Sequence, residues 1–236
     1  MIQREITLCL HGIGLPPPHV DHVENHYWCD EDVFHTILDG VAIAQSTGTV
    51  RVRLTFDDGN LSDLTRAAPA LQERGLSAVF FVCTGRLRRG GPYLGEADLA
   101  ALEAMGMEIG CHGRDHVRLR DVSDRVLREE TAGAKVALEH ALGHPVAEYV
   151  LPFGNYDHRV LHALGGFCRI HTTDARAGRP GERVVNRYCY SRAWDTDALT
   201  RILSEHPRRL RSARTWARLA LKRNRPGRRA SRRSQT

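Results

Sequence analysis

The sequence predicts an α/β fold, because stretches with the periodicity of strands alternate along the chain with stretches that have the periodicity of helices. Two further observations agree with this fold class. The run SAVFFVC at 77–83 is apolar throughout, which is typical of a strand buried on both faces of a parallel sheet. The length of 236 residues suits a single α/β barrel. We therefore expect a barrel-like domain, with an open doubly wound sheet as the alternative.

The stretch VRVRLTFDDG at 50–59 is the clearest strand. Its apolar residues alternate with arginine and threonine, which is the period of two that a strand requires. The strand ends on two adjacent acids, Asp57 and Asp58, followed by Gly59. An Asp-Asp-Gly turn is the simpler interpretation. Because neighbouring carboxylates repel each other, the pair also indicates a bound cation, a shared proton or a reacting group.

The other elements follow in chain order. Further strands are expected at 6–14, 77–83, 107–111, 148–151, 167–173 and 188–194. Helices, which place apolar residues at intervals of three and four, are expected at 27–46, 61–74, 95–105, 124–142, 157–164 and 196–205. Asp30 is a suitable N-cap for the first of these helices, and Gly75 is a suitable C-cap for the second.

The composition is that of a globular chain, with 42% hydrophobic and 6% aromatic residues. No run approaches the roughly 18 apolar residues of a membrane span. The start of the chain, MIQREITLCL, is too polar for a secretory signal, so the expected location is the cytoplasm. The six cysteines show no paired spacing, which fits reduced thiols. Cys111 is not expected to join His112 as a metal ligand, because neighbours on a strand point to opposite faces.

Charge is divided unevenly between the body of the chain and its end. Residues 207–236 hold twelve arginines and lysines and no acid, whereas residues 1–206 hold 22 basic and 28 acidic side chains. We therefore predict one folded domain at 1–206 and a basic C-terminal tail at 207–236.

Apolar residues lie at helical intervals among the arginines of the tail. They are Leu210, Ala213, Ala217, Ala220 and Leu221. This pattern is typical of a basic helix at an anionic membrane surface, which suggests a peripheral contact with the inner face of the membrane. A solvated tail without a specific partner is the simpler alternative. Nucleic acid is the least favoured partner, because the body is acidic and carries no recognisable binding motif.

Three motifs fall where predicted strands end. They are DDG at 57–59, HGRDH at 112–116 and PFGNYD at 152–157. Because the carboxyl ends of parallel strands gather on one face, we expect the motifs to meet there. One carboxylate and two imidazoles are suitable ligands for Zn²⁺, and three protein ligands leave a position for water. The second carboxylate can then act as a general base, which outlines a metal-assisted hydrolase.

At these residues the sequence resembles the polysaccharide deacetylases, the chitooligosaccharide-deacetylase-like carbohydrate esterases. TFDDG at 55–59 matches the first motif of that family. His112 and His116 match the spacing of its H-[ST]-x-x-H metal motif, with Gly113 in place of the hydroxyl residue. PFG at 152–154 matches the later part of R-x-P-[FY]-G. The resemblance covers roughly residues 6–174. It implies a distorted (β/α) barrel that hydrolyses N- or O-acetyl groups on a sugar or polysaccharide precursor.

Carried over residue by residue, the resemblance implies that Asp57 is the general base. The implied ligands of a divalent metal, with Zn²⁺ favoured, are Asp58, His112 and His116. The implied substrate-binding residues are Pro152, Phe153 and Gly154. Within that segment, the backbone N–H of Phe153 would help to hold the oxyanion of the tetrahedral intermediate.

The chain departs from the family's pattern at two points. The arginine that orients the base falls on Val150, and Arg114 or Arg176 is a candidate substitute. The late motif that supplies the general acid has no clear match after residue 174. His171 at a strand end is the nearest candidate, and a purely structural role is at least as good an interpretation of it. His11 is expected to be structural rather than to line the pocket.

These departures leave two other functions open. One is hydrolysis of a C–N bond outside sugars, such as a cyclic amide, on the same fold. The other is carbohydrate binding by a catalytically degenerate protein.

Overall fold

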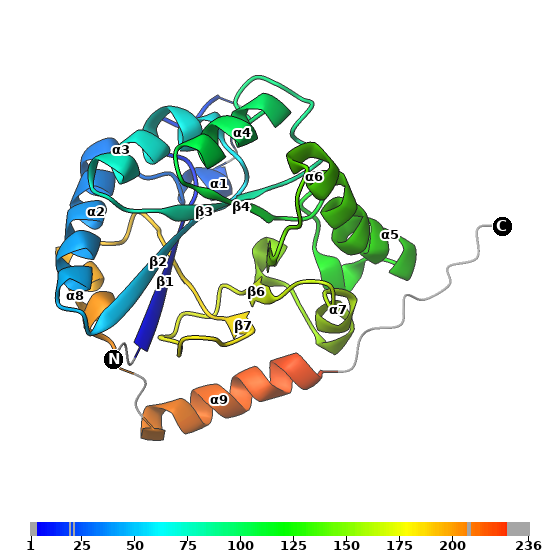
Figure 1. Ribbon diagram of the computed structural model, residues 1–236. Coiled ribbons are helices and arrows are strands. Elements are labelled where there is room, and N and C mark those ends of the chain that lie inside the picture. Colours follow the sequence, from blue (N-terminus) through cyan, green and yellow to red (C-terminus); the bar gives the residue numbers. More distant parts are fainter. Residues whose placement is uncertain (1–3, 19, 21, 207–208, 226–236) are drawn as a thin grey trace.

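The computed structural model describes residues 4–18, 20, 22–206 and 209–225. Within these residues one sheet of eight parallel strands has the order β7-β6-β5-β4-β3-β2-β1-β8. The strands are β1 (Arg4–Leu10), β2 (Val50–Phe56), β3 (Ala78–Val82), β4 (Glu108–Cys111), β5 (Glu148–Val150), β6 (Arg169–His171), β7 (Val184–Val185) and β8 (Tyr188–Cys189). Figure 1 shows the curled sheet with helices around its outer side. The predicted barrel-like α/β fold is therefore confirmed.

Helices connect the strands from β1 to β6, and two further helices follow β8. The helices are α1 (His22–Asn25), α2 (Glu31–Ser46), α3 (Ala68–Glu73), α4 (Glu96–Ala104), α5 (Asp124–Arg128), α6 (Ala134–Leu142), α7 (His158–Ala163), α8 (Thr196–Ser204) and α9 (Arg209–Asn224). Two π-helical turns lie within the predicted helices at 61–74 and 124–142. One, Asp63–Ala67, leads into α3, and the other, Glu129–Gly133, joins α5 to α6. Strand β7 was not expected from the sequence, because it is only two residues long and has no detectable period.

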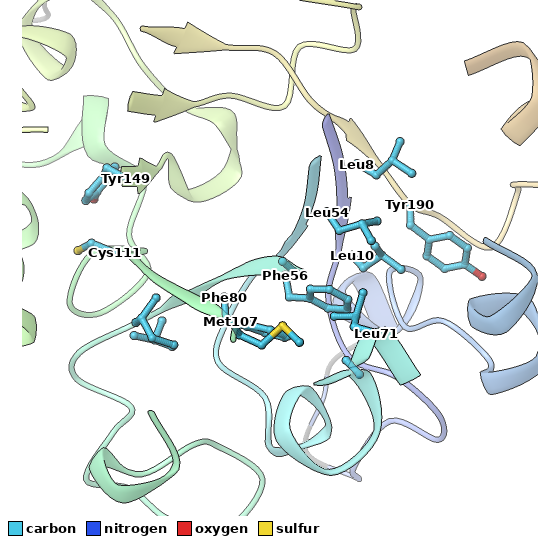
Figure 2. Close-up of a cluster of buried hydrophobic side chains, with 14 of the residues drawn as sticks. Leu8, Leu10, Leu54, Phe56, Leu71, Phe80, Met107, Cys111, Tyr149 and Tyr190 are labelled. Carbon is cyan, nitrogen blue, oxygen red and sulfur yellow. The ribbon is translucent and has the colours of Figure 1, made fainter. Parts of the chain in front are cut away.

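The two faces of the sheet differ in character because side chains alternate along each strand. On β2, Leu54 and Phe56 belong to the large apolar cluster that packs against the helices. Figure 2 shows them in this cluster beside Leu8, Leu10 and Phe80. The alternate residues on β2, Arg53 and Thr55, point the other way and bond across the inside of the curled sheet. The alternation in the sequence thus separates an apolar outer face from a polar inner face.

Charged side chains pair with each other on the inner face. Arg53 Nη2 lies 2.9 Å from Glu148 Oε1, and His171 Nε2 lies 2.7 Å from Glu148 Oε2. Arg169 Nη2 lies 2.5 Å from Glu5 Oε1 on β1. These contacts join β1, β2, β5 and β6 across the interior. They satisfy the charges that the curled sheet buries.

The edge strands β7 and β8 do not pair with each other in the described part of the chain. The loop before β7 crosses to β1 instead, where Gly178 and Glu5 exchange two backbone hydrogen bonds of 3.0 and 2.9 Å. This crossing places the loop against β1 on the side where the sheet stays open.

Helix α9 belongs to the predicted basic tail, and its C-terminal turns pack on the domain beside α7 (Figure 1). Leu219 is buried, and Lys222 Nζ lies 2.8 Å from Asp174 Oδ1. Ala217 and Leu221 stay exposed. The predicted apolar positions 210 and 213 lie outside the side chains that the structure describes, and the division of the chain at residue 206 stays a prediction. Among the described residues, no helix combines the length and apolar character needed to cross a bilayer.

Candidate functional site

A cavity of about 640 Å³ opens at the carboxyl ends of the strands. Its wall includes side chains from the carboxyl ends of six strands, or from the loops that follow them, namely His11, Asp57, Asp58, Arg86, His112, His116, Phe153 and Cys189. The fold therefore brings together the three motifs that are separate in the sequence. This is the edge at which a parallel α/β sheet normally holds its site.

Asp57 follows the last residue of β2 and forms a two-pronged ion pair with Arg187. Nη1 of Arg187 donates to Oδ1 at 2.7 Å, and Nη2 donates to Oδ2 at 2.8 Å. The rest of the buried guanidinium donates to Thr55 Oγ1 and to the carbonyl of Thr172. Burial alone would raise the pKa of Asp57, but the charge and hydrogen bonds of Arg187 hold that pKa well below its usual range. Asp57 is therefore ionised and fixed in orientation.

Arg187 is the main site residue that sequence reasoning missed. Neither predicted substitute pairs with Asp57 among the described residues: Arg114 lies 3.1 Å from Asp115 instead, and the ion pair of Asp57 is formed with Arg187. One feature of the sequence indicates Arg187. Arg187 is the single charged residue within VVNRYCY at 184–190. It stands two positions before Cys189, so the side chains of Arg187 and Cys189 share a face of the extended chain.

Val150 stands where the family has its arginine, and it is apolar for a structural reason. It is fully buried in a small cluster with Val79 and Phe81 inside the sheet. The guanidinium of Arg187 lies 5.9 Å from the centre of the Phe81 ring. Asp57 is thus oriented by an arginine from the β8 side of the barrel, while Val150 on the β5 side contributes apolar packing.

Asp58 has surroundings opposite to those of Asp57. Its Oδ1 is buried and accepts no hydrogen bond. The Nε2 atoms of His112 and His116 lie 3.7 and 3.5 Å from this oxygen. Arg86 Nη1 also approaches it, at 3.1 Å. An acceptor oxygen that faces two imidazole nitrogens without a hydrogen bond fits a site for a divalent cation.

The ring of His112 is held in the orientation that a metal ligand needs. Its Nδ1 lies 3.1 Å from the Val150 carbonyl, which can only accept, so the proton lies on Nδ1. The lone pair of Nε2 then faces Asp58. Burial lowers the pKa of His112, and it lowers that of His116 to about 3, so both imidazoles are neutral at pH 7. Cys83 Sγ also lies near the Asp58 and His112 ligand atoms and was not anticipated.

Backbone strain is concentrated at this site. Among the described residues, the non-glycine residues with positive φ are Asp58 at 81°, His116 at 56° and Phe153 at 56°. Such conformations cost of the order of 1–3 kcal/mol each and persist where the surroundings enforce them. Two of the predicted metal ligands and the predicted oxyanion residue are therefore held in place by the fold.

Gly113 replaces the hydroxyl residue of the family motif because the loop has no room for a side chain. Its φ is +82°, and a Cβ would lie 2.8 Å from Glu130 Oε2 and 3.1 Å from the Tyr149 hydroxyl. The Glu130 carboxylate accepts hydrogen bonds from the N–H groups of Arg114 and Asp115. This buried acid holds the loop between the two histidines.

The PFG segment contributes one side chain to the cavity. The Phe153 ring is 48% exposed and lines the wall, with its centre 4.4 Å from that of the His116 ring. Pro152 and Gly154 on either side of it in the chain are buried. A Cβ on Gly154 would lie 2.0 Å from Thr173 Oγ1, so this turn requires glycine. Of the three predicted substrate-binding residues, Phe153 therefore meets the cavity, and the other two shape its turn.

The two strand-end histidines lie in different surroundings. His171 is fully buried against Glu148 and lies away from the cavity wall, which agrees with the structural interpretation. His11 lines the cavity, so the expectation of a purely structural role is wrong. Its ring packs against Tyr27 with centres 5.2 Å apart, and its Nδ1 is buried without a hydrogen-bond partner.

The free thiols agree with the cysteine pattern in the sequence, since all six cysteines are unpaired. Cys111 lies in the apolar cluster on the outer face (Figure 2), which agrees with the expectation that it is not a ligand.

Comparisons with known proteins match this fold and these motifs. Residues 44–166 match the family model described as polysaccharide deacetylase. A curated relative, named "Putative polysaccharide deacetylase YxkH" from Bacillus subtilis (strain 168), is 26% identical over 157 residues. That alignment covers 64% of this chain and 56% of the relative, so the chain spans little more than half the relative's length.

Solved structures share the fold at low identity. The Streptococcus pyogenes deacetylase PplD, in complex with acetate, has a TM-score of 0.74 and 20% identity over 87% of this chain and all of its own. IcaB from Ammonifex degensii has a TM-score of 0.69 and 22% identity over 86% of this chain and 96% of its own. The family match spans the strand that ends in Asp57 and Asp58, the histidine pair and the PFG turn, within a barrel of the same type. The chain therefore belongs to the polysaccharide deacetylase family.

Proposed function

We propose that the chain is a metal-dependent hydrolase that removes acetyl groups from an N- or O-acetylated sugar or polysaccharide precursor. The observation that carries this proposal is the contrast between two neighbouring carboxylates. Asp57 is saturated by Arg187, whereas Asp58 Oδ1 faces two imidazoles without a hydrogen bond. One acid is thus suited to act as a base and the other to act as a ligand. Membership of the polysaccharide deacetylase family supports the same chemistry.

The residues that would hold the ion are Asp58, His112 and His116, a donor set of two nitrogens and one oxygen that favours Zn²⁺. When bound, the ion supplies Lewis-acid polarisation of the acetyl carbonyl and lowers the pKa of the attacking water. Asp57, which Arg187 keeps ionised and oriented, accepts the proton of that water. The N–H of Phe153 donates to the oxyanion that develops on the acetyl oxygen, an interaction worth about 2.7–4 kcal/mol in other enzymes.

His11 replaces His171 as our candidate for the proton donor to the leaving group. One of its ring nitrogens lies within 4.8 Å of an Asp57 oxygen, and the ring lines the cavity. We expect His11→Gln to lower the rate of acetate release by about 10²–10⁴-fold, the usual contribution of a general acid. The same change at His171 should leave the rate per folded molecule nearly unchanged. Equal losses in the two variants would contradict this assignment.

The proposal as a whole is tested by metal content and acetate release measured in the same samples. The variants are Asp58→Ala and His112→Ala, and the control is His144→Ala, a surface histidine that pairs with Glu103. The substrates are a panel of acetylated oligosaccharides. We expect about one divalent ion per chain in the wild type and the control, with acetate release, and loss of both in the two ligand variants.

Two other outcomes correspond to the other functions that the residues allow. Stoichiometric metal without acetate release would redirect the search to other amides, including cyclic amides, on the same scaffold. Absence of metal from the wild type, together with binding of the same oligosaccharides, would indicate a carbohydrate-binding protein.

We further propose that α9 contacts an anionic membrane surface, so that the protein acts peripherally at the inner, cytoplasmic face on a lipid-linked or nascent polysaccharide. Support comes from Arg218 and Leu221, which are exposed on this helix. Each basic residue near such a surface contributes about 1 kcal/mol. The test is co-sedimentation with anionic vesicles of the full-length chain and of a variant with glutamine at 209, 211, 214 and 218. Equal sedimentation of the two proteins would contradict membrane contact through this helix.

A further inference from the structure

We propose that Arg118 forms a subsite for an anionic group of the substrate on the wall of the cavity. The inference rests on the proposed function and names the substrate class more closely, as an acetylated glycan that carries a carboxylate or a phosphate ester. Arg118 lies two residues after the predicted ligand His116 and lines the same cavity. An anion bound there would therefore be close to the acetyl group that reacts.

Among the described residues, Arg118 differs from Arg187 and Arg86 at this end of the barrel in having no acidic partner. Arg187 is saturated by Asp57, and Arg86 lies 3.1 Å from Asp58 Oδ1. In contrast, no described carboxylate lies within 4 Å of the guanidinium of Arg118, and no hydrogen bond of its side chain is present in the described part of the chain. A cation that lines a cavity without a counterion is available to a ligand.

The position of Arg118 is set by a stacking contact and not by an ion pair. Its guanidinium carbon lies 4.5 Å from the centre of the Phe153 ring. The same ring lies 4.4 Å from His116. Stacking on an aromatic face orients the planar guanidinium and leaves its N–H groups free for a carboxylate or phosphate, which bind it through two parallel hydrogen bonds. The contacts of one ring thus link the anion subsite to a predicted metal ligand.

A neighbouring arginine provides a matched control. Arg114 is exposed on the same loop but lies outside the cavity wall, where it pairs with Asp115 at 3.1 Å and Glu129 at 3.7 Å. Replacing Arg118 by methionine removes the charge while keeping an apolar side chain against Phe153. Replacing Arg114 by methionine removes an equal charge from the same loop.

The experiment compares acetate release from matched substrates by wild type, Arg118→Met and Arg114→Met. The substrates are a neutral N-acetylglucosamine oligosaccharide, the same chain with an added carboxylate, and the same chain with an added phosphate ester. We expect the wild type and Arg114→Met to prefer at least one anionic substrate by about tenfold to a hundredfold in kcat/KM, through KM. We expect Arg118→Met to lose that preference and keep its kcat on the neutral substrate. The two anionic arms distinguish the carboxylate from the phosphate.

Two results would overturn the subsite. One is equal kcat/KM for all three substrates in the wild type. The other is an equal loss of kcat on all three in Arg118→Met, which would mean that Arg118 merely holds Phe153 in place. The subsite can also be tested without turnover. Calorimetry measures the affinities of the same oligosaccharides for Asp57→Asn. If the wild type released no acetate from any of the three substrates, but Asp57→Asn bound an anionic oligosaccharide more tightly than Asp57→Asn combined with Arg118→Met did, the proposed reaction would be refuted and the subsite retained.

Discussion

The outer and inner faces of the sheet are stabilised by different kinds of contact. On the outer face, Phe56 and Phe80 stack with ring centres 4.7 Å apart within one continuous apolar cluster. On the inner face, Asp57 meets Arg187, and Glu148 meets Arg53 and His171, in specific pairs. Apolar contacts tolerate other side chains of similar volume, whereas a buried ion pair needs both partners. The inner face is therefore the one on which a single substitution affects both stability and activity.

Arg187→Met, on the inner face, is expected to have the largest effect, because it should lower both stability and activity. Removing one partner of a buried ion pair typically costs about 3–5 kcal/mol, because the other charge stays buried without compensation. We therefore expect the free energy of unfolding to fall by about this amount. Acetate release per folded molecule should fall at least a hundredfold, because Asp57 loses its orientation. Chemical denaturation and steady-state kinetics measure the two effects.

A conservative variant and a double variant sharpen this prediction. Arg187→Lys keeps the charge but loses the two-pronged geometry, so it should lie between wild type and Arg187→Met in both measurements. Asp57→Asn combined with Arg187→Met removes the unpaired charge and should recover part of the lost stability without recovering activity. If Arg187→Met retained wild-type stability and rate, the Asp57–Arg187 pair would neither stabilise the fold nor support the reaction.

On the outer face, Phe80→Ala should change stability alone. Phe80 is fully buried, and deletion of such a side chain typically costs about 3–5 kcal/mol. Phe80→Leu keeps most of the volume and should cost less than about 1.5 kcal/mol. Val136→Ala, at a position 66% exposed, is the surface control and should change stability by less than about 0.5 kcal/mol. Loss of activity per folded molecule in Phe80→Leu would show that the faces are not independent.

The same difference explains how much the sequence could predict. The apolar period of β2 and the acids that follow it are local, so the strand, the barrel class and the meeting of three motifs could be inferred from neighbouring residues. Arg187 is 130 positions from Asp57, and only the closing of the barrel brings them together. His11 and His171 both follow or end strands, and nothing local indicates which one faces the cavity. Pairing across the interior is a property of the fold, and single-sequence periodicity does not contain it.

A smaller effect than those of Arg187→Met and Phe80→Ala is a pH dependence of stability that belongs to the inner face. Burial lowers the pKa of His171 to about 4, against an ordinary value of 6.5 in the unfolded chain. Between these two values the unfolded state binds a proton that the folded state does not, so stability falls as the pH falls through this window. One pKa unit corresponds to about 1.4 kcal/mol, which gives an expected loss of about 2–3 kcal/mol from pH 6.5 to pH 4.

His171→Gln should remove this contribution, because glutamine does not titrate but can still donate to Glu148. The measurement is the free energy of unfolding across the window, with the exposed His140→Gln as control. Identical slopes for wild type and His171→Gln would mean that the inner face tolerates a charged imidazole, and the contrast between the two faces would then apply only to the Asp57–Arg187 pair.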